Sequence, residues 1–113
     1  MDKQYKVVIL PEAQDDMRRI ILYIARNLHA PSAALHLETA FRDAILSLAF
    51  MPKRIKTIDE EPWKEIGIRK VKVQNYFVYY LVDDKCQTVY INAVIYIKRD
   101  QIRQLIEKEI GWM

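Results

Sequence analysis

The stretch from Ile68 to Asp100 constrains the fold most, because it contains three consecutive runs with the composition of β-strands. β-branched and aromatic residues dominate all three runs. Gln74 and Asn75 form a short polar break after the first run, and residues 83–85 form a longer break after the second. Each run has about the 5 to 8 residues that are usual for a strand. The stretch therefore predicts an antiparallel meander of three strands.

The first run has two different faces. Alternation places Lys70 and Lys72 on one face, and Val71 and Val73 on the other. One face is therefore basic, and the other is expected to pack in the core. The middle run, Tyr76 to Val82, is apolar on both faces, as expected for a central strand that is covered on both sides.

The third run, from Thr88 to Lys98, also has a polar face and a packing face. Alternation assigns to the polar face Tyr90, Asn92, Tyr96 and Lys98. If Tyr96 and Lys98 share a face with the two lysines of the first run, the sheet presents a cationic, aromatic-lined surface. Such a surface is of the kind that binds polyphosphate backbones. This surface is the candidate site.

Positive charge is concentrated in the sheet half of the chain. Eight basic and four acidic residues lie between Lys64 and Arg103, whereas the formal charge of the whole chain is +3. A basic face favours an anionic partner. The alternative is that lysines at the edges of the sheet only protect it from aggregation.

Composition predicts a single domain over residues 1–113, because 113 residues that are 51% hydrophobic can bury one core. No run approaches the roughly 20 apolar residues of a membrane span, and we expect a cytoplasmic protein without a membrane partner. Cys86 is the only cysteine, and two histidines without clustered carboxylates do not predict a metal site. Neither a cofactor nor a metal is expected.

Two prolines predict the start of two helices before the meander. Residues 5–10 form a short apolar strand, and Pro11 follows where the first turn of a helix needs no amide proton. The first helix, to about Leu28, has an apolar stripe of Ala13, Met17, Ile20, Ile21, Ile24 and Leu28. The second helix, from Pro31 to about Met51, has an apolar stripe of Ala34, Leu37, Phe41, Ala44, Ile45 and Leu48. These helices are expected to form a hairpin that covers one face of the sheet.

The predicted fold is α+β, in the order β-α-α-β-β-β with a short C-terminal helix. A four-stranded, mainly antiparallel sheet packs on the helical hairpin, and the first strand inserts beside a later one. Residues 53–67 are expected to be a loop, packed down by Trp63. Asp100 is placed to cap the last helix, in which apolar residues share one side, namely Ile102, Leu105 and Ile106.

Three passages resemble toxins of type II toxin–antitoxin modules in the RelE/ParE superfamily, over nearly the full length of the chain. They are LPEAQDDMRRIILYI, APSAALHLETAFRDAILSLAFMP and EPWKEIGIRKVKVQNYFVYYLVDD, the last followed by VYINAVIYIKRD. The pieces GIR, NYFVYY and YIKRD carry the match as a set. The resemblance implies a RelE/ParE-like fold, a small basic toxin, and a co-encoded antitoxin that wraps it in a hetero-oligomer.

The two branches of this superfamily imply different targets. RelE-like toxins cleave messenger RNA on the ribosome, and ParE-like toxins poison DNA gyrase. Lys70, Lys72 and Lys98 match basic residues of the RelE-like branch. Phe77 stands where RelE-like enzymes often have a catalytic arginine, and Tyr96 stands where many relatives have histidine. The long helical hairpin looks more like the ParE branch.

For the RelE-like reading, the resemblance implies a metal-independent endoribonuclease that blocks translation. Attack of a 2′-hydroxyl on the adjacent phosphate needs a base, an acid and cations. Lys70 or Lys72 is the candidate base or phosphate ligand, with its pKa depressed by neighbouring cations. Arg69 is the candidate phosphate clamp. The pocket is completed by Tyr96, Lys98 and Arg99.

On the sequence we expect the toxin to inhibit growth as a ribosome-dependent endoribonuclease. Two alternatives stay open, namely a gyrase poison and a binding module without catalytic activity. The proposed RNA-binding residues are Arg69, Lys70, Lys72, Lys98 and Arg99, and the proposed catalytic residues are Arg69, Lys70, Lys72, Tyr96 and Lys98. Arg69 also has a structural reading, since it shares parity with the packing face of the first run.

Overall fold

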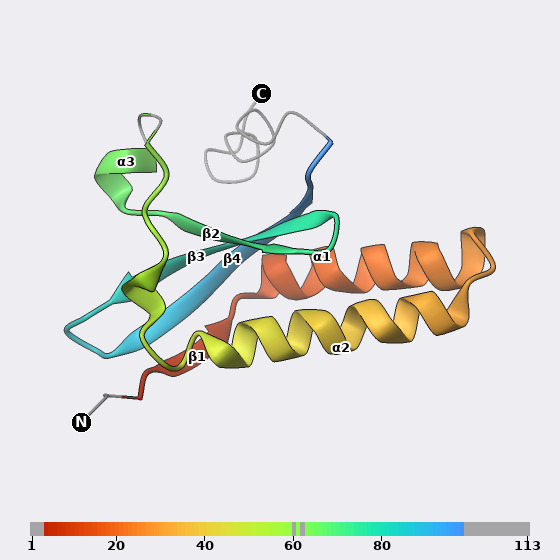
Figure 1. The fold of residues 1–113 in the computed structure, drawn as a ribbon, viewed down its shortest axis with the longest axis horizontal. Helices are drawn as coiled ribbons and strands as arrows, with labels where there is room; N and C mark the ends of the chain where they lie inside the picture. The colour runs from red at the N-terminus through yellow and green to blue at the C-terminus, as the bar shows by residue number, and fades with distance from the viewer. Residues whose placement is uncertain (1–3, 60, 62, 99–113) are drawn as a thin grey trace.

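The computed structural model describes residues 4–59, 61 and 63–98 (Figure 1). Its elements are β1 (Lys6–Ile9), α1 (Pro11–Leu22), a π-helical segment η1 (Tyr23–Asn27), α2 (Pro31–Ser47), a 3-10 turn η2 (Pro52–Arg54), α3 (Trp63–Ile66), β2 (Arg69–Val73), β3 (Tyr76–Asp83) and β4 (Thr88–Tyr96). The predicted order β-α-α-β-β-β is confirmed. The predicted C-terminal helix, with its cap at Asp100, lies outside the described residues.

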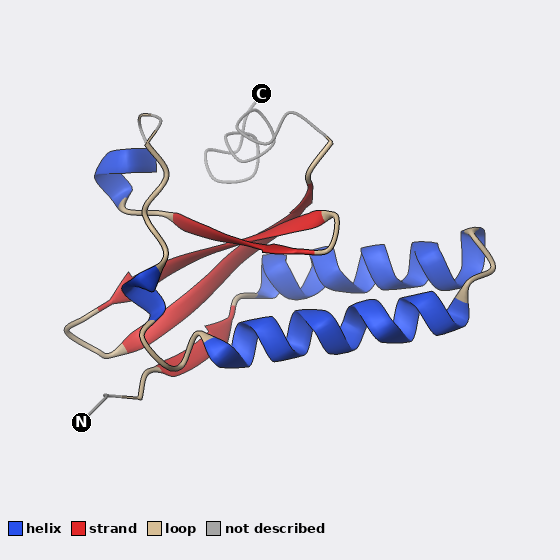
Figure 2. Cartoon of the chain, in the orientation of Figure 1, coloured by secondary structure: helices blue, strands red, loops and turns tan. Residues whose placement is uncertain are grey.

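The sheet has the strand order β1-β4-β3-β2. β1 runs parallel to β4, whereas the other two pairs are antiparallel. The expected four-stranded, mainly antiparallel sheet is therefore confirmed, and the first strand pairs with the last one. Helices α1 and α2 lie side by side against one face of the sheet and extend beyond it, as Figure 2 shows.

The main core lies between the helical hairpin and the sheet. Both helices begin at a proline, Pro11 and Pro31, as predicted. The buried residues of this core are Ala13, Leu37, Phe41, Ile45 and Leu48 from the helices, and Val73, Val78, Tyr80, Val89, Ile91 and Val94 from the strands. Burial of this apolar surface is the main stabilising contribution to the fold.

A second, smaller cluster packs on the opposite face of the sheet, which we call the second face. It consists of Ile58, Trp63, Ile68, Tyr79, Ala93 and Ile95. Trp63 is buried, as expected, and the amide of Ile58 donates to the carbonyl of Ile68. The prediction of a plain loop over residues 53–67 is wrong in part, because α3 forms within it and the end of η2 reaches into it.

A β-bulge divides β4 into two halves with opposite alternation. Tyr79 pairs with Ala93, but Tyr80 pairs with Ile91, so Asn92 is an extra residue on β4. Val89 and Ile91 lie in the main core, and after the bulge it is Val94 that faces this core. The prediction of one unbroken alternation from Thr88 onward is therefore wrong.

β4 is also longer than its neighbour β1. The parallel pairing ends at Ile9 and Ile91, because Pro11 then turns the chain into α1. Beyond this point a side chain of α1 takes the place of a strand. The Asp16 carboxylate, which is buried, accepts a hydrogen bond of 2.9 Å from the amide of Val94.

Candidate functional site

Lys70 and Lys72 lie on the second face of the sheet, as predicted. Their partners in β3 are Tyr79 and Phe77, respectively. The Lys70 ammonium lies 4.3 Å from the centroid of the Phe77 ring, in a cation–π contact. Tyr79 packs edge-on against Phe77 and is only 2% exposed. This face therefore offers a lysine pair beside one aromatic ring, with Lys72 exposed to solvent.

Arg69 points to the hairpin side of the sheet, and it makes contacts that hold the fold. Its guanidinium donates to the backbone carbonyl of Ile55, and more weakly to that of Lys53. It thereby ties the 53–55 segment to the edge strand β2. The expected role as a phosphate clamp stays a prediction, and the structural reading explains the observed contacts.

The neighbouring Tyr80 fixes the same segment from the core. Its hydroxyl donates a buried hydrogen bond of 2.8 Å to the carbonyl of Pro52. Burial raises the pKa of the Tyr80 phenol, and the positive charges of Arg69 and Arg54 act in the opposite direction. Arg69 and Tyr80 thus both donate to backbone carbonyls of residues 52–55.

Tyr96 lies on the hairpin side too, because the bulge reverses its direction. It pairs with Tyr76, and the two ring centroids are 5.5 Å apart. Tyr76 in turn packs edge-on against Phe41 of α2. Burial, and to a lesser degree Tyr96, raises the pKa of Tyr76. The prediction that Tyr96 shares a face with Lys70 and Lys72 is wrong.

Lys98 is exposed in the turn that follows β4. The preceding amide, of Ile97, donates to the carbonyl of Asn75 in the turn between β2 and β3. Arg99 lies outside the described residues. The predicted site residues are thus divided, with Lys70 and Lys72 on the second face, Arg69 and Tyr96 on the hairpin side, and Lys98 beyond the end of the sheet.

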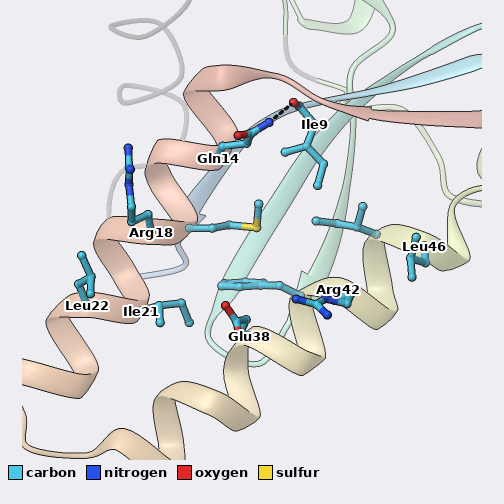
Figure 3. A pocket seen from close by; sticks show the side chains of 11 residues that line it. Ile9, Gln14, Arg18, Ile21, Leu22, Glu38, Arg42 and Leu46 are labelled. Atoms are coloured by element: carbon cyan, nitrogen blue, oxygen red, sulfur yellow. Dashed lines mark hydrogen bonds between the residues drawn. The ribbon is translucent and has the colours of Figure 1, made fainter.

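A groove of about 590 Å³ runs along the seam between α1 and α2 (Figure 3). We call it the hairpin groove. Its lining is Ile9, Gln14, Met17, Arg18, Ile21, Leu22, Glu38, Phe41, Arg42, Ile45 and Leu46. Gln14 donates to the carbonyl of Ile9 at one end, as the dashed line in Figure 3 shows. Leu22 and Leu46 are exposed at its rim.

A groove of larger volume, about 1090 Å³, lies between the hairpin and the second half of β4. We call it the edge groove. Its lining is Asp16, Arg19, Ile20, Tyr23, Ile24, Leu28, Ala30, Ala33, Leu37, Gln74, Asn75, Tyr76, Val94, Ile95 and Tyr96. Most of these side chains are apolar or aromatic, and Arg19 brings a cation that is 70% exposed.

Asp16 is the residue of this region that was not singled out from the sequence. It lies at helical spacing from Ala13 and Ile20, on the apolar stripe of α1. A carboxylate in such a stripe needs a partner, and here it accepts from the Val94 amide and pairs with Arg19. A carboxylate within this apolar stripe was therefore the sequence feature that could have identified Asp16 as a buried, hydrogen-bonded residue.

The described residues contain neither a cluster of metal ligands nor a membrane-spanning helix. No group of three or more His, Cys, Asp or Glu residues that could hold a metal ion occurs there. Within the same residues, no helix has the length and apolar character needed to cross a membrane.

Comparison with known proteins decides the family. Residues 7–101 match the family model described as the ParE toxin of the type II toxin–antitoxin system parDE. The chain belongs to this family. The match spans both grooves and the lysine pair on β2. The predicted kinship with RelE/ParE superfamily toxins is therefore confirmed. None of the curated proteins matches the sequence significantly.

Three solved structures show that the fold of this ParE-family chain is shared. The RelBE2 toxin–antitoxin complex of Mycobacterium tuberculosis has 21% identity and a TM-score of 0.60, over 82% of this chain and 98% of that one. The chromosomal ParDE system of P. aeruginosa has 14% identity and a TM-score of 0.68, over 85% and 99%. The isolated RelE toxin of E. coli has 17% identity and a TM-score of 0.51, over 94% and 98%. At these identities the likeness concerns the fold alone, and it includes both branches.

Proposed function

We propose that this toxin stops growth by binding DNA gyrase, and that it does so without cleaving RNA. The family match supports the ParE branch. The observation that carries the proposal is the division of the predicted ribonuclease residues, with Arg69 and Tyr96 on the opposite side of the sheet from Lys70 and Lys72.

Cleavage of RNA by a 2′-hydroxyl needs a base, an acid and a charge-stabilising group around one phosphate. The second face supplies two lysines, and one of them already lies over the ring of Phe77. The histidines, His29 and His36, belong to the hairpin, which packs against the other face. A mode of action by binding alone requires none of these groups to converge.

The second candidate function is the ribosome-dependent endoribonuclease. The lysine pair beside Phe77 favours it, because two cations next to an aromatic ring suit an RNA backbone and a stacked base. In that case the ribosome would supply the missing positioning of the messenger RNA. Lys70 and Lys72 would then be the residues that determine activity.

A co-encoded antitoxin is the further partner under this proposal, and the cytoplasm is the proposed location of the pair. The antitoxin would hold the toxin inactive in a hetero-oligomer, and a role in growth regulation and plasmid stabilisation follows from that arrangement. The chain carries a formal charge of +3, which suits an acidic protein partner.

Expression of the toxin in a growing culture tests the proposal, with DNA and protein synthesis followed by pulse-labelling. In the culture we expect DNA synthesis to fall before protein synthesis, and we expect double-strand breaks in the DNA. In a separate assay with purified toxin and ribosomes, we expect messenger RNA to stay intact. The double substitution Lys70→Ala with Lys72→Ala should leave the arrest unchanged, as should the control Lys56→Ala, an exposed lysine that is not among the predicted site residues. Messenger cleavage that the double substitution abolishes would instead establish the ribonuclease.

A further inference from the structure

The helical hairpin extends beyond the sheet at the end where α1 passes through η1 into α2 (Figure 1). We call residues 22–36 the hairpin tip. The main contacts of η1 are with α1 and α2, so the tip is held in place chiefly by the hairpin itself. Eleven of its fifteen residues are exposed. The tip therefore offers most of its surface to solvent or to a partner.

Large apolar side chains are concentrated on the hairpin tip. Of the eight large hydrophobic residues that are exposed among the described residues, half belong to the tip, namely Leu22, Tyr23, Leu28 and Leu35. They lie on more than one side of it, because Leu22 lines the hairpin groove whereas Tyr23 and Leu28 line the edge groove. Exposed apolar side chains that cluster in this way mark an interaction surface. A partner that covers all of them must surround the tip and must therefore be concave.

The hairpin tip carries a positive charge and no negative one. No acidic residue occurs in the sequence between Asp16 and Glu38. The two arginines that precede the tip are each paired with an aspartate. Arg26, within the tip, is exposed and has no ion-pair partner among the described residues. A single cation in an otherwise apolar surface is complementary to a carboxylate on the partner.

Hydrogen bonds of unusual span fix the backbone of the hairpin tip. The amide of Leu28 donates to the carbonyl of Tyr23, and the amide of Ala30 donates to that of Ile24. Between these donors, His29 has a φ of 50°, in the left-handed region that favours glycine. Turns of the π type are frequent at functional sites. Because the turn holds Tyr23 and Leu28 in one arrangement before a partner binds, association requires less ordering of the chain.

We infer that the hairpin tip is the element that this toxin inserts into its target protein, in a concave site that combines apolar side chains with a carboxylate. The four exposed apolar residues of the tip fill the apolar part of that site, and Arg26 pairs with the carboxylate. The inference rests on the proposed function, which makes DNA gyrase the target.

The chemistry of the hairpin tip favours a protein over other occupants. A nucleic-acid backbone is bound by several cations at once, and Arg26 is the only lysine or arginine of the tip. An anionic lipid surface likewise attracts clusters of basic residues. Two tips from two copies of this chain would bring like charges together. A protein cleft with one carboxylate matches both the apolar residues and the lone cation.

Two leucines of α2 provide a matched pair of variants. Leu35 and Leu46 are 63% and 59% exposed, and they lie on the same face of the helix because about three turns separate them. Leu35 belongs to the tip, whereas Leu46 is near the other end of α2. With purified toxin and gyrase, Leu35→Ser should raise the toxin concentration that half-inhibits DNA supercoiling by about tenfold, and Leu46→Ser by less than about twofold. Equal effects, or a larger effect of Leu46→Ser, would overturn the inference.

Two exposed arginines of the hairpin test the charge. Arg26 lies in the tip and Arg42 in the hairpin groove, and neither has an ion-pair partner among the described residues. We expect Arg26→Glu to weaken inhibition of gyrase about fivefold more than Arg42→Glu, and we expect this difference to shrink at high salt. The reverse order would place the contact in the hairpin groove and would contradict the inference. Urea unfolding of each free variant separates loss of inhibition from loss of stability.

Photo-crosslinking identifies what the tip contacts. A photoreactive phenylalanine analogue replaces Leu28 or, as the control, Ile66 of α3, which are 54% and 51% exposed. In a mixture of gyrase, DNA and phosphatidylglycerol vesicles, we expect a crosslink from position 28 to a gyrase subunit and none from position 66. A crosslink from position 28 that is no stronger than the control, or that joins DNA, lipid or a second toxin chain, would overturn the inference.

The wild-type toxin separates the two levels of the argument. If it does not inhibit gyrase at all, the proposed function is wrong, and the inference about the tip is wrong with it. If it inhibits gyrase and the tip variants Leu35→Ser and Arg26→Glu inhibit equally well, the proposed function stands and only the inference is overturned.

Discussion

The two halves of β4 are held in the sheet by different means. The first half, residues 88–91, has β1 on one side and β3 on the other. The second half, residues 92–96, has β3 on one side and the Asp16 carboxylate on the other. The comparison shows that one buried side chain can take the place of a strand, and that no strand of the described residues pairs with the rest of this edge.

An aspartate supports each half of β4, and the two carboxylates differ in burial. Asp84 lies in the turn before the first half, where it accepts from the Tyr5 hydroxyl and from the Lys53 ammonium, and it is exposed. Asp16 supports the second half and is 4% exposed. Loss of its acceptor costs a buried donor much more free energy than it costs an exposed donor, which can bond to water instead. The two carboxylates should therefore contribute very differently to stability.

Truncation of a core side chain in the first half should have the largest effect. Ile91 is fully buried in the main core, and Ile91→Ala should lower the free energy of unfolding by about 2–5 kcal/mol. Ile95→Ala is the matched change in the second half, and it should cost less, because Ile95 belongs to the smaller cluster on the second face. Urea denaturation of the two variants measures the difference. An equal or larger loss for Ile95→Ala would mean that the smaller cluster contributes at least as much to stability as the main core.

Removal of the Asp16 carboxylate should have the next largest effect. Asp16→Ala leaves the Val94 amide buried without its acceptor, which should cost about 1–3 kcal/mol. Asp16→Asn keeps an acceptor oxygen of similar shape and should recover a large part of this loss. Hydrogen exchange gives the local readout, since the Val94 amide should become faster in the alanine variant and change little in the asparagine variant. If the alanine variant is as stable as the wild type, the carboxylate does not support this half of the strand.

Much of the fold could be predicted from the sequence, because it is determined by local patterns. Runs of β-branched and aromatic residues gave the three strands, and Pro11 and Pro31 marked the start of both helices. The bulge could not be predicted, since Asn92 fits an unbroken alternation as well as a broken one. It is tolerated although the side-chain oxygen of Asn92 is buried without a hydrogen-bond partner among the described residues.

Whether the predicted site residues of β4 share a face with those of β2 depended on Asn92, the extra residue of the bulge. Lys70 and Lys72 were placed correctly relative to each other, because no bulge interrupts β2. Tyr96 was placed on the wrong face, because it follows the extra residue Asn92 in β4 and the bulge reverses the alternation of the side chains after it. The contacts of Arg69 with the carbonyl of Ile55 depend on where the 53–55 segment folds back, which no local pattern specifies.

Acidification should have the smallest effect, and it tests the exposed carboxylate that supports the first half. The hydrogen bond from Lys53, and then the one from Tyr5, hold the pKa of Asp84 below its usual value of 3.8. A carboxyl whose pKa is lower in the folded state stabilises the fold fully above its unfolded pKa and loses this contribution as the pH falls through the folded pKa. Stability should therefore decline a little below about pH 4 in the wild type, and this part of the decline should be absent in Asp84→Asn, as urea midpoints at several pH values would show. Because this carboxylate is exposed, solvent screens its interactions, and the decline should be much smaller than the loss caused by Asp16→Ala. A comparable loss would mean that the carboxylate in the turn before β4 contributes as much to stability as the one beside its bulged second half.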